Sequence, residues 1–304
     1  MADILFADGV LFFPVTAFDE AGGVDAATTE RHVAAGVAAG PGGVFAACGT
    51  GEFHALALDE YETVLRATIA GAAGRVPVVA GAGGQLGHAI ACARIAERQG
   101  ADGLLVLPPY LVEGTQAGLL RYVEALAAAT ELPLIVYHRG SGRVTPETAA
   151  ALFRMPQVAG LKDGVGDIAV AQQIVLAGAR SGRDLLFFNG LLTAELSQAA
   201  YRGIGVPLYS SAVFAMAPEI ANAFYRADRA GDDEGRRLLL DGFYDPFVRL
   251  RDESPGFAVA LIKAGLRLAG VPVGGVRPPL TDPDAAQTAR LAALIERGHR
   301  LAAR

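Results

Sequence analysis

The chain is predicted to be an α/β protein, a (β/α)8 (TIM) barrel with a C-terminal helical extension. Three observations support this prediction: apolar runs recur about every 25 to 30 residues, each is followed by an Ala-rich stretch of helical periodicity, and there are eight of them. Eight such units favour a closed barrel over an open, doubly wound sheet. We expect the barrel over residues 1–217 and the extension over residues 218–304.

The expected elements follow one another in regular alternation. Runs rich in β-branched and other apolar residues predict strands over residues 10–15, 43–48, 77–81, 103–107, 133–137, 158–162, 185–189 and 204–209. Apolar residues at helical spacing predict helices over residues 26–39, 58–72, 88–99, 115–129, 146–153, 168–179 and 193–201. Thr145 before Pro146 is typical of a capped helix start, and Asp59 opens another helix. In the extension, helices near 219–230, 234–250, 257–268 and 283–300 are expected to serve packing and assembly.

Composition and charge narrow the function class. With 52% hydrophobic and 19% charged residues and no Ser-rich or Pro-rich linker, the chain can bury one large core. A net charge of -6 and a pI near 5.4 provide no basic stripe for nucleic acid or for an anionic membrane. The N-terminus lacks a secretory signal, and no apolar run reaches the roughly 20 residues that cross a bilayer. We expect a cytoplasmic protein that acts on a small molecule.

Cysteine, histidine and glycine patterns predict neither a disulfide, a metal nor a cofactor. Cys48 and Cys92 lie in apolar or Ala-rich segments, where a buried thiol is ordinary. The five histidines show no metal-ligand spacing. The glycines of residues 81–87 resemble a dinucleotide-binding turn, but the next strand ends in Pro108-Pro109 with no acidic residue for a ribose.

A lysine and a tyrosine end two consecutive strands. Lys162 closes the apolar run 158–161, and Tyr137 closes the preceding strand. The C-terminal ends of barrel strands meet at one mouth, so we expect the two side chains side by side. A buried lysine has a lowered pKa and can attack a carbonyl as the neutral amine, while a phenol can relay protons. From spacing alone, a solvated Lys162 and a core Tyr137 stay open; Lys263, the other candidate, lies in a helix of the extension.

Polar residues also follow the other strands. Thr50 stands among the glycines of residues 49–51, whose free N–H groups can bind a carboxylate and let the hydroxyl approach Tyr137. An ordinary Gly-rich turn is the alternative. Arg139, Asn189, Ser210 and Ser211 follow the strands that end nearby, so they are expected at the same mouth.

Five motifs in order resemble the dihydrodipicolinate synthase and N-acetylneuraminate lyase family. They are Phe13-Pro14-Val15-Thr16, Gly49-Thr50-Gly51-Glu52, Pro108-Pro109-Tyr110, Val136-Tyr137 and Gly160-Leu161-Lys162-Asp163. The resemblance covers nearly the whole chain. Within the family, residues 46–53, 109–111, 189–190 and 209–214 are most similar to the dehydratases that decarboxylate a keto sugar diacid.

Three departures bear on this resemblance. Dihydrodipicolinate synthases usually carry a threonine where this chain has Gly49 and a second tyrosine where it has Leu111, so their proton relay between subunits would be missing. His138, followed by residues 139–143, stands where the dehydratases favour asparagine. The contacts to the far end of the substrate therefore stay open.

The resemblance implies a Schiff-base lyase without a cofactor or metal. Lys162, Tyr137 and Thr50 would be catalytic, and Gly49 and Pro14 would bind the substrate, with Gly49 and Thr50 holding the carboxylate beside the keto group. The departing carboxylate would be held by Arg139, Asn189, Ser210 or Ser211. The implied assembly is a homotetramer, a dimer of dimers. The alternatives are a class I aldolase or synthase of the same family that acts on pyruvate or on a 2-keto-3-deoxy sugar acid, and a catalytically silent sensor, which the intact Thr50, Tyr137 and Lys162 disfavour.

Overall fold

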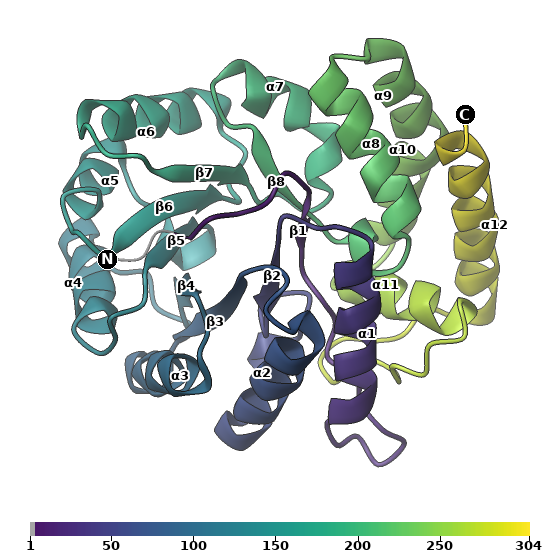
Figure 1. Cartoon of the computed structure of the whole chain (residues 1–304), viewed down its shortest axis with the longest axis horizontal. Coiled ribbons are helices and arrows are strands. Elements are labelled where there is room, and N and C mark those ends of the chain that lie inside the picture. Colours follow the sequence, from purple (N-terminus) through teal and green to yellow (C-terminus); the bar gives the residue numbers. More distant parts are fainter. Residues whose placement is uncertain (1–3) are drawn as a thin grey trace.

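The strands form a closed parallel barrel, as predicted. The computed structural model describes residues 4–304, and the eight strands within this range are hydrogen-bonded in chain order, with β1 closing onto β8 (Figure 1). They are β1 (Leu11–Phe12), β2 (Gly43–Ala46), β3 (Val78–Gly84), β4 (Gly103–Pro109), β5 (Leu134–His138), β6 (Val158–Asp163), β7 (Leu186–Asn189) and β8 (Leu208–Ser211). The expected start of β8 at 204 was wrong, because the N–H of Val206 still bonds to the carbonyl of Tyr201 in the preceding helix.

Helices between the strands surround the barrel, also as predicted. They are α1 (Ala26–Ala38), α2 (Leu58–Ala72), α3 (Leu86–Gln99), α4 (Gln116–Ala127), α5 (Pro146–Leu152), α6 (Ile168–Arg180) and α7 (Gln198–Gly203). Thr145 caps α5, because its side chain accepts the N–H of Thr148. Asp59 instead lies inside the first turn of α2, where the neighbouring Glu60 accepts the N–H of Ala57.

Successive side chains on the strands alternate between the barrel interior and the layer under the helices. The interior cluster includes Leu11, Phe13, Leu105, Ile135 and Tyr137. Their sequence neighbours, such as Phe12, Val106 and Val136, belong to the larger cluster between strands and helices. Both cysteines are buried and free, as predicted. Interior positions at the C-terminal strand ends therefore face the barrel mouth.

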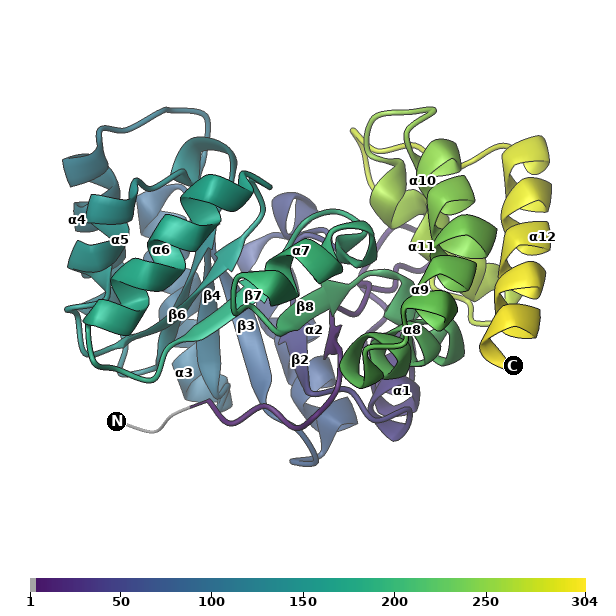
Figure 2. The same ribbon diagram turned by 90° about the horizontal axis from the view of Figure 1, so that it is seen from above.

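The extension packs against one side of the barrel. Its elements are α8 (Pro218–Ala230), α9 (Asp233–Leu239), a π-helical turn (Leu240–Tyr244), α10 (Asp245–Arg251), α11 (Phe257–Leu268) and α12 (Ala285–Ala302). Figures 1 and 2 show these helices on the side of the barrel opposite α4, α5 and α6. The single helix expected over 234–250 is interrupted by the π-helical turn. The boundary between 217 and 218 stays a prediction. Across residues 4–304, the length and hydropathy needed to span a membrane do not occur together in any helix.

Candidate active site

Lys162 and Tyr137 are direct neighbours in the sheet. The β5–β6 register pairs the two residues. The Lys162 Nζ lies 3.9 Å from the ring centroid of Phe13 and 4.5 Å from that of Tyr137. Burial of the amine among these rings lowers the pKa of Lys162 to about 7. A substantial fraction of the amine is then neutral, and nucleophilic, near neutral pH.

The phenol of Tyr137 is held by two hydrogen bonds. It donates to the carbonyl of Gly190 at 2.8 Å and accepts from Nη1 of Arg139 at 2.9 Å. Burial raises the pKa of Tyr137, and the nearby Arg139 charge opposes that shift only in part. The phenol is therefore protonated at neutral pH and is oriented to exchange a proton next to Lys162.

Two glycines leave the space that these side chains occupy. A Cβ at Gly190 would overlap the aliphatic chain of Lys162, and one at Gly164 would lie 2.7 Å from Cε2 of Tyr137. Gly160, two residues before Lys162, faces the backbone of Leu186 and leaves no space for the lysine.

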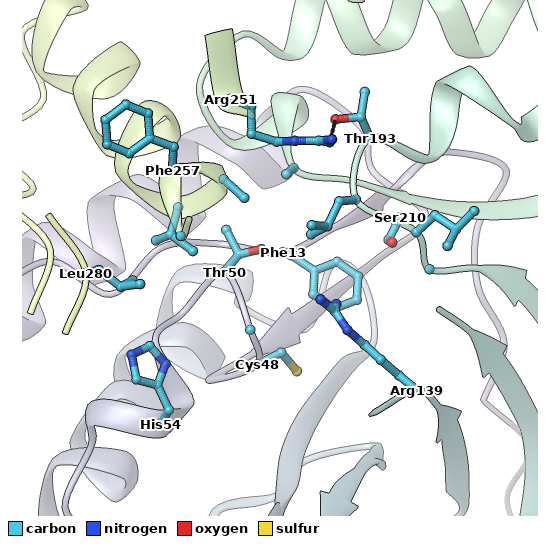
Figure 3. Close-up of a pocket in the computed structure, with 18 of the residues that line it drawn as sticks. Phe13, Cys48, Thr50, His54, Arg139, Thr193, Ser210, Arg251, Phe257 and Leu280 are labelled. Atoms are coloured by element: carbon cyan, nitrogen blue, oxygen red, sulfur yellow. Dashed lines mark hydrogen bonds between the residues drawn. The ribbon is translucent and has the colours of Figure 1, made fainter. Parts of the chain in front are cut away.

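Lys162 lines a cavity of about 610 Å³, which Figure 3 shows in close-up. It is lined by six of the nine predicted site residues, namely Gly49, Thr50, Tyr137, Arg139, Lys162 and Ser210. The structure does not bring the other three to its wall, namely Pro14, Asn189 and Ser211. The Arg139 side chain points into the cavity and bonds to the Tyr137 phenol, so it is not a solvated loop residue.

Strand alternation explains why Pro14, Asn189 and Ser211 do not line the cavity. Asn189 and Ser211 are the outward neighbours of the interior positions 188 and 210, as Pro14 is of Phe13. The amide of Asn189 donates to the Ser197 hydroxyl at 2.9 Å, and the Ser211 hydroxyl donates to a buried Glu195 carboxyl oxygen at 2.5 Å. Asn189 and Ser211 therefore hold the segment after β7, residues 195–197, by hydrogen bonds outside the cavity.

The turn after β2 presents backbone to the cavity. Residues 47 and 52 adopt left-handed conformations at its two ends, and the N–H of Glu52 donates to the carbonyl of Gly49. We expected the Thr50 hydroxyl to approach Tyr137, but within residues 4–304 these two side chains share no hydrogen bond. The phenol oxygen of Tyr137 accepts a hydrogen bond from Arg139 instead. Thr50 still lines the cavity, so its hydroxyl is free to meet a substrate.

His138 faces away from the cavity. Its Nδ1 accepts the N–H of Val144 at 2.9 Å, and its Nε2 lies 3.9 Å from Asp163. Burial lowers the pKa of His138, so the ring is mainly neutral. His138 thus fixes the loop after β5 and leaves the inward position to Arg139.

The extension also contributes to the cavity wall, which the sequence reasoning missed. Arg251, Asp252 and Phe257 from the extension, and Thr193 from the loop after β7, line the cavity. Figure 3 shows Arg251, Phe257 and Thr193 on the side away from Cys48. The sequence offered one indication of these residues: the charged pair Arg251-Asp252 is followed by a helix break at residues 254–256. No local sequence pattern, however, shows that this break lies over the barrel mouth.

Comparisons with known proteins address the family and the fold. The model of the Dihydrodipicolinate synthetase family matches residues 7–297. A probable 5-dehydro-4-deoxyglucarate dehydratase of Streptomyces griseus is 56% identical over 97% of this chain and 93% of its own, and one of Streptomyces coelicolor is 53% identical over 98% and 95%. The crystal structure of dihydrodipicolinate synthase from Oceanobacillus iheyensis superposes with a TM-score of 0.88 at 22% identity, over 97% of each chain.

Proposed function

Because the chain belongs to the dihydrodipicolinate synthetase family, we propose that it uses a Schiff base to dehydrate and decarboxylate 5-dehydro-4-deoxy-D-glucarate. The products are 2,5-dioxopentanoate, carbon dioxide and water. The names of relatives at 53% and 56% identity support the substrate. The observation that carries the chemistry is the buried Lys162 amine beside the phenol of Tyr137.

Lys162 condenses with the keto group next to one carboxylate of the substrate. The neutral amine attacks the carbonyl carbon, and loss of water from the carbinolamine gives a protonated imine, an electron sink. The lowered pKa of Lys162 makes this attack possible near pH 7.

The imine then supports both bond-breaking steps. Loss of a proton from the adjacent methylene gives an enamine, which expels the hydroxyl on the next carbon as water. The resulting conjugated iminium accepts the electron pair of the carbon–carbon bond to the far carboxylate, and carbon dioxide leaves. Tautomerisation and hydrolysis release 2,5-dioxopentanoate and the free lysine.

Tyr137 is the proton relay in this scheme. Its phenol carries a proton to the carbinolamine and to the departing hydroxyl, and the Arg139 guanidinium stabilises the phenolate that forms in between. The carboxylate beside the keto group binds at Gly49 and Thr50, which line the cavity, with backbone N–H groups and the threonine hydroxyl as donors. Ser210, which lines the cavity at the C-terminal end of β8, is proposed to contact the chain of the substrate.

The decisive experiment combines trapping with product analysis. Borohydride added during turnover reduces the imine to a stable amine, so mass spectrometry of the peptide containing residue 162 is expected to show the adduct, and Lys162→Ala is expected to show none. A coupled assay for the semialdehyde, with carbon dioxide measured in parallel, tests the reaction. Labelling without release of carbon dioxide would assign the protein to a retro-aldol lyase. An unmodified peptide from an enzyme that is turning over would refute the Schiff base.

The protein is further proposed to act in the cytoplasm as a homotetramer, a dimer of dimers. The resemblance to the family suggests this assembly, and the exposed apolar side chains of Tyr110, Leu111 and Val112 provide surface for subunit contact. Sedimentation velocity at micromolar concentration tests it, with a monomer as the contrary result.

A further inference from the structure

Three Lys and Arg side chains line the cavity within the described residues, and two of them already have roles. Lys162 is the proposed nucleophile, and Arg139 donates to the Tyr137 phenol. The third is Arg251, at the C-terminal end of α10 in the extension. Its side chain is only 12% exposed, although most surface arginines are solvated.

The Arg251 guanidinium is held by a neutral hydroxyl, that of Thr193, and by a carboxylate, that of Asp252. Its Nη1 donates to the hydroxyl of Thr193 at 2.8 Å. Its Nε and Nη2 donate to Asp252 at 2.7 and 3.1 Å. The Asp252 side chain is 60% exposed, so solvent weakens that ion pair. The guanidinium is therefore positioned, and its charge is only partly neutralised.

Thr193 is held in a strained conformation to make this contact. It is buried, yet its φ is 54°, in the left-handed region that β-branched residues rarely adopt. Such strain persists where the surroundings impose it, commonly at functional sites. Since Thr193 Oγ1 accepts from Arg251, its own proton can be donated to another oxygen. In Figure 3 the two side chains meet on the side of the cavity away from Cys48.

We propose that Arg251 and Thr193 bind the substrate carboxylate remote from the keto group. The inference rests on the proposed function and names the recognition element for the second acid group. A guanidinium N–H and a hydroxyl together match a carboxylate. The shared charge also suits the reaction, because a full ion pair would stabilise the carboxylate that must leave as carbon dioxide. The C-terminal extension thereby determines specificity.

The test compares two keto acids that differ only at the far end. 2-Oxohexanedioate carries the second carboxylate and 2-oxohexanoate lacks it; both can be trapped on Lys162 with borohydride. The ratio of trapped products in competition measures recognition without turnover. The variants are Arg251→Gln and Thr193→Val, with Arg249→Gln as the matched control, because Arg249 lies on the same helix in an exposed pair with Asp245.

Wild type and Arg249→Gln are expected to favour the diacid. Arg251→Gln is expected to reduce that preference about 10- to 100-fold, as loss of a charge-assisted contact would, and Thr193→Val by less. An unchanged preference in Arg251→Gln, an equal loss of trapping for both acids, or a wild type without preference overturns the inference. Turnover is scored separately: a wild type that traps both acids but releases no carbon dioxide from the sugar diacid refutes only the dehydratase.

Discussion

The ammonium of Lys263 lies 2.6 Å from a carboxyl oxygen of Glu52, and both side chains are fully buried. Glu52 ends the turn that presents Gly49 and Thr50 to the cavity, and its other oxygen accepts the N–H of Arg277 at 2.8 Å. The ion pair thus connects the cavity-facing turn after β2 to α11 of the extension.

Breaking this pair is expected to destabilise the fold. Lys263→Met leaves the Glu52 carboxylate buried without its counter-charge, which costs about 3–5 kcal/mol. Urea denaturation followed by circular dichroism measures the free energy of unfolding. The control Arg249→Met removes an exposed pair worth at most about 1 kcal/mol. A Lys263→Met protein as stable as this control would show that the pair does not hold the turn.

The pKa of Lys162 predicts how imine formation depends on pH. Since burial lowers this pKa to about 7, the rate of borohydride trapping with pyruvate is expected to rise about tenfold per pH unit below 7 and to level off above it. An ordinary lysine would keep gaining rate towards pH 10. A trapping rate that still rises steeply between pH 8 and 10 would contradict the lowered pKa.

The same lowered pKa predicts a dependence of stability on pH. Between about 7 and the unfolded value of 10.5, the unfolded chain binds a proton at Lys162 that the folded chain does not. The destabilising effect of Lys162 is therefore complete below pH 7 and disappears as the pH rises through that window. Lys162→Met is expected to be more stable than wild type at pH 6, with a difference that shrinks by pH 10. Parallel urea titrations at both pH values check this, and a constant difference would contradict it.

Tyr137→Phe is expected to separate binding from proton transfer. The variant keeps the ring beside Lys162 but loses the hydroxyl that bonds to Gly190 and Arg139. Loss of a general acid–base group lowers kcat by about 100- to 10,000-fold. Steady-state kinetics on the sugar diacid measure it, with Tyr225→Phe as control, because Tyr225 lies in α8 and does not line the cavity. A kcat within tenfold of wild type would assign the relay to another group.

The sequence was sufficient to predict the barrel and the neighbouring positions of Lys162 and Tyr137, because both depend on local patterns. Apolar runs and helical periodicity repeat with the units of the fold, and a lysine that ends an apolar strand stands out. Strand alternation, applied strictly, would also have separated Ser210 from Ser211 and excluded Asn189. Assigning side chains to the interior or the exterior in this way requires the exact residue at which each strand begins. Apolar runs in the sequence define that residue poorly.

Contacts between distant segments could not be predicted. Arg251 bonds to Thr193, which lies 58 residues earlier in the sequence. Lys263 pairs with Glu52 from a helix whose sequence indicates only ordinary packing. Each contact depends on how the extension sits on the barrel, and no spacing in the chain encodes that placement. The missed residues all lie where the two parts meet.

Gly190→Ala is expected to impair the nucleophile by crowding alone. Gly190 is buried and its backbone suits any residue, but an added methyl group would overlap the aliphatic chain of Lys162 and push the amine away from Tyr137. Overpacking of this kind costs about 1–3 kcal/mol of stability. Trapping with pyruvate is expected to slow at least about 100-fold, as a displacement near 1 Å at a reacting group does. The control Gly203→Ala ends α7 in open space and should trap like wild type. Equal trapping rates in the two variants would show that Lys162 has room to move, and the close fit would then have no catalytic role.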